Sequence, residues 1–250
     1  MKYLTFLLVF LVIPIVLLAF YNRKQLPMRR IHRPLSTLML LSLIALVYTT
    51  PWDNYLVYRG VWLYGSNRVI GTIGYVPIEE YLFFLLQPLF LSLLFLAFLP
   101  KTFFPPKPSL RWHSSHWKGT LIYSLLTFLG VVALKYERLL YAGLILVWAG
   151  PVLLGQWAFG AHLIRTYAPT VLKALSVGVT YLWIIDSWAI HDQIWTIAAQ
   201  TSTGLKIGPL PVEEALFFFL TSLMVLQGLA LLLHPQTTHD VDNTTAPHRH

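Results

Sequence analysis

Seven long apolar runs constrain this chain more than any other feature of its sequence. A helix needs roughly 17–25 mostly apolar residues to cross a bilayer, and only 11% of the 250 residues are charged. The runs are Tyr3–Tyr21, Leu35–Thr50, Ile78–Leu99, Thr120–Leu134, Leu139–Ile164, Thr170–Ile190 and Val212–Leu233. The sequence therefore predicts an all-α integral membrane protein with seven transmembrane helices.

The first run could also be read as a secretory signal, because Lys2 precedes it. It is too long for the apolar region of such a signal, and no cleavage site of small residues follows it. We therefore expect it to remain as a helix. The chain contains no cysteine, which excludes disulfides, thiol chemistry and a cysteine-ligated metal.

The basic residues gather on one side of the predicted bundle. A net charge of +8 could indicate a nucleic-acid partner, but twelve of the eighteen basic residues fall in segments expected on the same side. They are Arg23, Lys24, Arg29, Arg30, Arg33, Lys101, Lys107, Arg111, Lys118, Arg165, Lys173 and Arg249. This asymmetry predicts a cell-membrane protein with its N-terminus outside and its C-terminus in the cytoplasm. Its basic loops would contact lipid headgroups, and no nucleic acid is expected as a partner.

The acidic residues gather on the opposite side. Acids contribute little to membrane topology, so a site is the natural cause of their clustering. Eight of the ten lie there, namely Asp53, Glu79, Glu80, Glu137, Asp186, Asp192, Glu213 and Glu214.

A nine-residue segment occurs twice in nearly the same form. Val76–Phe84 reads VPIEEYLFF, and Leu210–Phe218 reads LPVEEALFF. Further matches lie upstream, where the two copies are one residue closer together in the sequence than the two nine-residue segments are. They pair Asp53 with Asp186, Trp62 with Trp195 and Gly71 with Gly204. An extra residue before Gly208, the counterpart of Gly74, reconciles the two spacings. Self-similarity of this kind indicates an internal repeat.

The repeat predicts one membrane domain, 1–234, built from two parallel three-helix repeats. Repeat one covers 1–100, repeat two covers 139–234, and a linker helix at 119–135 gives both the same orientation, a 3+1+3 arrangement. The polar tail at 235–250 is expected to be disordered and cytoplasmic.

Each repeated segment opens a helix with Pro-x-Glu-Glu. Pro77 and Pro211 suit the first helical position, where a missing N–H costs nothing. The four glutamates, Glu79, Glu80, Glu213 and Glu214, would then lie in first turns, where acids are ordinary caps. Their recurrence next to hydrocarbon favours a functional role instead. Consecutive helical residues point about 100° apart, so only one of each pair can face a shared cavity.

Aromatic residues surround both acidic segments, including Trp62 and Trp195. They could form an interfacial belt, or line a cavity whose ring faces stabilise a carbocation. A protonated carboxyl beside an ionised one suits acid and base roles, and with aromatic walls it points to proton-initiated chemistry on an alkene. Asp53 and Asp186 are supporting candidates by repeat position. Gly71–Gly74 lacks the third glycine of a dinucleotide-binding motif.

The doubled PIEE and PVEE motifs, each opening a Phe-rich helix, resemble those of the heterodimeric-type lycopene cyclases, here in the fused two-subunit form. The resemblance covers roughly residues 1–234. It implies a redox-neutral cyclisation of lycopene or a related acyclic carotenoid to ionone rings of the β type, without flavin, nicotinamide or metal. It carries over the motif residues Pro77, Glu79, Glu80, Pro211, Glu213 and Glu214. It further implies other enzymes of carotenoid biosynthesis as partners.

Three other classes compete with this interpretation. A retinal protein needs a lysine in its last helix, and Val212–Leu233 contains none. A membrane prenyltransferase needs aspartate-rich motifs that hold magnesium diphosphate, and no Asp-x-x-x-Asp pair occurs. A small 3+1+3 transporter could use paired acids for proton coupling. Gln87-Pro88 could kink the third helix of such a transporter.

Overall fold

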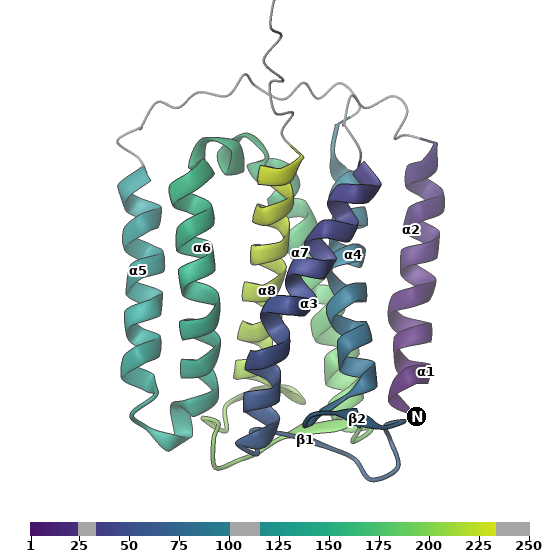
Figure 1. Ribbon diagram of the computed structural model, residues 1–250, viewed down its shortest axis with the longest axis vertical. Coiled ribbons are helices and arrows are strands. Elements are labelled where there is room, and N and C mark those ends of the chain that lie inside the picture. Colours follow the sequence, from purple (N-terminus) through teal and green to yellow (C-terminus); the bar gives the residue numbers. More distant parts are fainter. Residues whose placement is uncertain (25–33, 101–115, 234–250) are drawn as a thin grey trace, which may run out of the picture.

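The computed structural model describes residues 1–24, 34–100 and 116–233, which form an upright bundle of helices (Figure 1). Six described helices are long and apolar enough to cross a membrane. A seventh, α5, is apolar but shorter. The first span consists of α1 (Tyr3–Leu7), the π-helical turn η1 (Leu8–Val12) and α2 (Ile13–Arg23). The helices that follow are α3 (Pro34–Tyr58), α4 (Ile78–Phe98), α5 (His116–Ala133), the 3-10 turn η3 (Glu137–Leu139), α6 (Leu140–Thr166), α7 (Ala168–His191) and α8 (Val212–Leu232).

Helix α3 is longer than the sequence predicts. We expected it to end at Thr50, but it continues through Pro51 to Tyr58. Proline is tolerated inside membrane helices when nearby groups satisfy the freed backbone atoms. Asp53 and the aromatic residues beside it therefore lie on a helix and not in an outer loop.

Three short β-ladders close one end of the bundle, and the sequence did not predict them. β1 (Trp62–Tyr64) pairs antiparallel with β4 (Trp195–Ile197), with Leu63 opposite Thr196. β2 (Thr72–Ile73) forms a hairpin with β3 (Val76–Pro77), as β5 (Lys206–Ile207) does with β6 (Leu210–Pro211). The β1–β4 ladder joins two segments that the sequence repeat matches to each other.

The motif prolines lie one residue before the position we expected. Pro77 and Pro211 are the N-caps of α4 and α8, with ψ angles of 147° and 143°. Their extended backbone completes β3 and β6, so each helix begins at the next residue.

The hydrogen bonds into the helix starts also correct one repeat match. Ile78 N donates to the Gly71 carbonyl, whereas Val212 N donates to that of Leu205. Gly71 therefore corresponds to Leu205, and Gly204 is the extra residue, with a φ of +77°.

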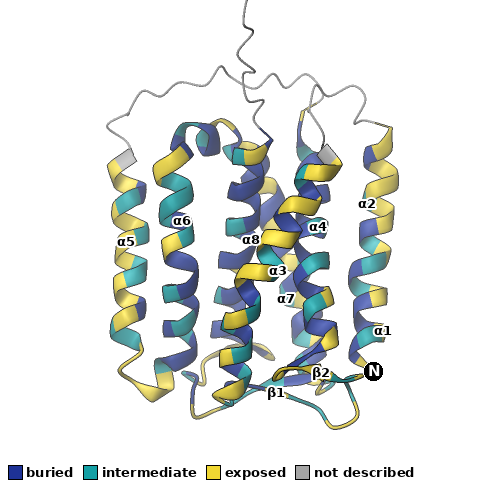
Figure 2. Ribbon diagram, in the orientation of Figure 1, coloured by how far each residue is buried: buried dark blue, intermediate teal, exposed yellow. Residues whose placement is uncertain are grey.

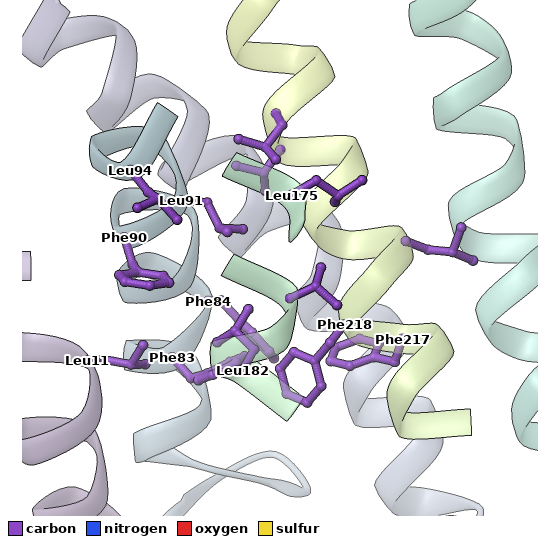
Figure 3. Close-up of a cluster of buried hydrophobic side chains, with 14 of the residues drawn as sticks. Leu11, Phe83, Phe84, Phe90, Leu91, Leu94, Leu175, Leu182, Phe217 and Phe218 are labelled. Atoms are coloured by element: carbon purple, nitrogen blue, oxygen red, sulfur yellow. The ribbon is translucent and has the colours of Figure 1, made fainter. Parts of the chain in front are cut away.

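Helices α4 and α8 form the centre of the bundle and carry the most buried side chains (Figure 2). Helices α2, α3 and α7 pack against α4, while α3, α6 and α7 pack against α8, and α5 packs on α6. At one level of the core, Phe83 and Phe84 from α4 lie near Phe217 and Phe218 from α8 (Figure 3). The rings of Phe83 and Phe218 are 6.1 Å apart.

The strands and the N-terminus lie at one end of the bundle, and the helix ends at Arg23, Phe98 and Leu232 lie at the other (Figure 1). Several residues of the predicted basic loops fall outside the described ranges, namely Arg29, Arg30, Arg33, Lys101, Lys107 and Arg111, as does the predicted tail at 235–250. At the strand end, Arg68 Nη1 contacts Asp192 Oδ2 at 3.1 Å, and the Met1 amino group contacts the same carboxylate.

Candidate active site

Four acidic side chains meet inside the strand end of the bundle. Asp53, Glu80, Asp186 and Glu214 come from α3, α4, α7 and α8, and none is more than 5% exposed. Both aspartates interact electrostatically with both Glu80 and Glu214. Since burying a charge is costly unless it is paired, four such groups together mark a functional site and not a packing solution.

Glu80 is held by two tyrosines. The Tyr64 hydroxyl, at the end of β1, donates to Glu80 Oε1 at 3.0 Å, and Tyr3 from α1 also hydrogen-bonds this carboxyl. Burial, and then the nearby Glu80 carboxylate, raise the pKa of Tyr64 well above its usual value. The Tyr64 phenol therefore remains a neutral hydrogen-bond donor.

Glu214 has a matching pair of donors. The Tyr141 hydroxyl, near the start of α6, donates to Glu214 Oε1 at 2.7 Å, and Trp62 Nε1 donates to the same oxygen at 3.1 Å. Tyr3 and Tyr141 thus hold the two glutamates from the first helix of each half. Trp62 lies on β1, so the first half supplies a donor to the glutamate of the second.

The two aspartates differ in their contacts. Trp195 Nε1 on β4 donates to Asp186 Oδ1 at 2.9 Å. Both carboxyl oxygens of Asp53 are buried without a hydrogen-bond partner among the described residues. Trp62 and Trp195 are repeat partners and line the same cavity, but they bind acids of different kinds.

A cavity of about 20 Å³ lies between the two halves. Space of this size holds about one water molecule. Glu80 and Glu214 both line it, together with Tyr3, Trp62, Phe83, Asp186, Trp195, Phe217 and Phe218. One acidic cavity with aromatic walls therefore receives a glutamate from each repeated motif.

The other glutamate of each motif points away from this cavity. Glu79 Oε1 accepts from Ile70 N at 2.8 Å. Glu213 Oε1 accepts from the backbone N and the hydroxyl of Thr203, both at 2.6 Å. These two carboxylates hold the loops before the hairpins, as expected for neighbours about 100° apart on a helix.

Sequence reasoning missed Tyr3 and Tyr141. They lie further apart in the sequence than the matched glutamates or the matched aspartates do, so a constant spacing does not pair them. Their position near the start of the first helix of each half was the available signal. Within residues 1–24, 34–100 and 116–233, no group of three or more His, Cys, Asp or Glu side chains could hold a metal ion.

The chain is similar to known proteins over most of its length. The family model described as "Lycopene cyclase" matches residues 2–99 and 120–232. The chain is 38% identical over 233 residues to a lycopene beta-cyclase of Halobacterium salinarum, and the match covers 92% of this chain and 95% of the relative.

Fungal relatives are matched over part of their length. A bifunctional lycopene cyclase/phytoene synthase of Aspergillus oryzae is 33% identical over 202 residues, and one of Leptosphaeria maculans is 36% identical over 220. Each match covers 79% of this chain, but only 34% and 37% of the relatives. No solved structure matches the chain.

Proposed function

This chain belongs to the lycopene cyclase family, and from this premise we propose that it cyclises the linear ends of lycopene, or of a related acyclic carotenoid, to β-type ionone rings. The observation that carries the proposal is the single cavity that Glu80 and Glu214 line together between aromatic side chains. The family match gives no support to the transporter alternative.

The reaction is redox-neutral. A carboxylic acid donates a proton to the terminal double bond of the polyene, which leaves a tertiary carbocation. The π electrons of a second double bond then attack this cation, closing a six-membered ring and moving the charge to a ring carbon. A carboxylate removes the proton from the neighbouring carbon. One proton enters and one leaves, so the reaction needs no flavin, nicotinamide or metal.

Glu80 and Glu214 are the side chains best placed for these proton transfers. Two donors hold each carboxyl, which fixes its orientation toward the cavity. Positioned acid–base groups of this kind typically contribute about 10²–10⁴ in rate. The rings of Trp62 and Phe217, with centroids 5.5 Å apart at the same cavity, can stabilise the cationic intermediate through their faces. Asp53 and Asp186 would maintain the proton balance of the site.

Glu79 and Glu213 have a supporting role in this proposal. They belong to the Pro-x-Glu-Glu motifs, but their hydrogen bonds go to loop backbone. With Pro77 and Pro211 as N-caps, they set the start of α4 and α8. The starts of these helices in turn direct Glu80 and Glu214 inward.

We further propose a 3+1+3 architecture of the fused heterodimeric type, with two parallel repeats related by a pseudo-twofold axis and one composite site. The packing supports it, because α3 contacts α4 and α8 just as α7 contacts α8 and α4. α5 packs beside α6, as the linker helix would. The hydrogen bond from Trp62 to Glu214 crosses between the repeats.

We place the protein in the cell membrane, with the strand end outside and the C-terminus in the cytoplasm. Its partners are the lipid bilayer and the carotenoid itself, and other enzymes of carotenoid biosynthesis would exchange substrate and product with it.

Expression in a host that accumulates red lycopene tests the proposed activity. We expect yellow-orange pigment that chromatography identifies as ringed carotenoid, and activity of the purified protein in detergent without flavin or nicotinamide. Unchanged lycopene in cells that contain the folded protein would contradict the proposal.

A further inference from the structure

A second and larger cavity lies deeper in the bundle, between α3, α4, α6 and α8. Its volume is about 160 Å³, and its mainly apolar lining includes Leu41, Thr49, Phe84, Val152, Phe217 and Met224. A groove of about 580 Å³ adjoins it on the outer side of α3 and α6, along Leu43, Ile44, Val47, Tyr48 and Trp148. Ile44, Tyr48 and Trp148 line both spaces. The apolar cavity and the groove therefore adjoin each other at these three side chains and together mark a path inward from the surface of the bundle.

This path leads to the acidic cavity. Phe217, one turn after Glu214 on α8, lines both the apolar and the acidic cavity. Its ring stacks 5.7 Å from that of Trp52 and lies 5.5 Å from that of Trp62. Phe217 is thus the wall between the two spaces, and rotation of its side chain would join them.

Side chains and not helix packing close the outer face of the path. The Tyr48 hydroxyl donates to the Trp148 carbonyl oxygen at 2.8 Å, and Trp52 Nε1 donates to the Leu144 carbonyl oxygen at 3.2 Å. The rings of Trp52 and Trp148 stack 4.5 Å apart. Such contacts can open by rotamer changes without separating the helices, which suits a ligand that arrives from the bilayer.

We propose that this apolar cavity and groove, which we call the α3–α6 channel, bind the extended polyene chain of the carotenoid. The inference rests on the proposed function and adds the substrate's route. A dry cavity of about 150 Å³ binds benzene, so the inner cavity accommodates a comparable end segment. The remaining polyene lies along the groove beside the lipid. The end of the carotenoid is directed past Phe217 toward Glu214.

The other half of the bundle carries different side chains at two positions of this channel. When the repeats are aligned on their glutamates, Met224 corresponds to Phe90, which is 5% exposed and has its ring 5.3 Å from that of Tyr181. When they are aligned on their aspartates, Thr49 corresponds to Leu182, which is fully buried. At these two positions the counterpart side chains are therefore larger or more apolar, and both are buried. With one channel serving the composite site, the two ends of a symmetric carotenoid react in separate binding events.

The repeat itself supplies the test. Met224→Phe and Thr49→Leu each introduce into the channel the residue found at the matching position of the other repeat. Both variant proteins should therefore fold. Because one methylene in an apolar pocket is worth roughly 10–200-fold, each variant should lose at least about tenfold in ring formation. Phe90→Met, the reverse change on the filled side, should leave ring formation within about twofold of the wild type.

A binding measurement separates blocked access from damaged chemistry. Lycopene should co-purify with the Glu214→Gln protein, measured as polyene absorbance per protein, and adding Met224→Phe should abolish it. Wild-type ring formation and lycopene retention in folded Met224→Phe and Thr49→Leu proteins would overturn the channel while leaving the proposed function intact. Failure of the wild type to form rings would instead overturn the proposed function.

Discussion

At the scale of single residues, the two glutamates of each Pro-x-Glu-Glu motif lie in different surroundings. Glu80 and Glu214 face one cavity and accept hydrogen bonds from tyrosine and tryptophan side chains. Glu79 and Glu213 accept hydrogen bonds from the loops that precede the hairpins. In the proposed mechanism, therefore, one glutamate of each pair transfers protons and its neighbour holds the local structure.

This division predicts unequal effects of Glu→Gln changes. Gln cannot supply the proton, so Glu80→Gln or Glu214→Gln should lower ring formation by about 10²–10⁴ while folded protein remains in the membrane. Glu79→Gln and Glu213→Gln keep an acceptor oxygen toward the loop and should cost about 1 kcal/mol of stability with activity largely retained. Pigment analysis and thermal unfolding in detergent measure both effects. Loss of activity in a stable Glu79→Gln protein would move that residue into the chemistry.

A second prediction concerns Asp192 at the strand end. Its hydrogen bond with the Met1 amino group, and then the charge of Arg68, lower the pKa of Asp192. A lowered folded-state pKa gives stability that is present above the unfolded value of about 3.9 and is lost as the pH falls through the folded-state value.

Asp192→Asn should therefore reduce the thermal stability at neutral pH, and the difference from the wild type should disappear as the pH falls through the lowered folded-state pKa of Asp192. Because the ion pair is partly exposed, high salt should shrink the difference as well. A destabilisation independent of pH and salt would show that packing, and not charge, is responsible.

At the scale of elements, the hairpins before α4 and α8 set where these two helices begin. Both turns have a glycine with positive φ at the first central position, +65° at Gly74 and +62° at Gly208, as type II′ turns require. Their surroundings differ. A Cβ at Gly74 would lie 2.4 Å from Asn54 Oδ1, which accepts from Tyr75 N, whereas at Gly208 nothing lies within 4 Å.

The two glycines therefore form a matched pair for mutation. Gly208→Ala carries only the left-handed backbone strain of about 1–2 kcal/mol. Gly74→Ala adds the clash with Asn54 and should cost clearly more, about 2–4 kcal/mol. Thermal unfolding of the two variants under the same conditions checks the order. Equal losses would mean that the Asn54 contact contributes nothing to the position of α4.

The sequence predicts the helices better than the strands. Apolar runs locate six spans and the shorter α5 because burial in lipid demands such runs. The predicted end of this helix at Thr50 was wrong, because α3 continues through Pro51 to Tyr58, beyond the apolar run. The strands are two or three residues long, too short for a periodic signal. β1 and β4 pair only because the two halves meet in space.

At the scale of the whole molecule, the repeat explains why the acidic cluster could be located from the sequence but its tyrosine donors could not. The glutamates and aspartates stand at nearly constant offsets, so their convergence follows from two parallel halves. Tyr3 and Tyr141 reach Glu80 and Glu214 from different helices through tertiary packing. The α3–α6 channel arises from side chains that differ between the halves, such as Met224 and Phe90. A sequence repeat reveals what the halves share, and the structure is needed for what they do not.

The orientation of the whole bundle gives the last prediction. The absence of cysteine allows single cysteines to be placed on an otherwise unreactive chain. Ser66 is exposed at the strand end, and Thr166 is exposed at the opposite end (Figure 1). Because the predicted basic loops are retained on the cytoplasmic side, a membrane-impermeant thiol reagent should label Ser66→Cys in intact cells. Thr166→Cys should react only after the membrane is opened. The reverse pattern would invert the bundle, and with it place the Glu80–Glu214 cavity near the cytoplasmic face.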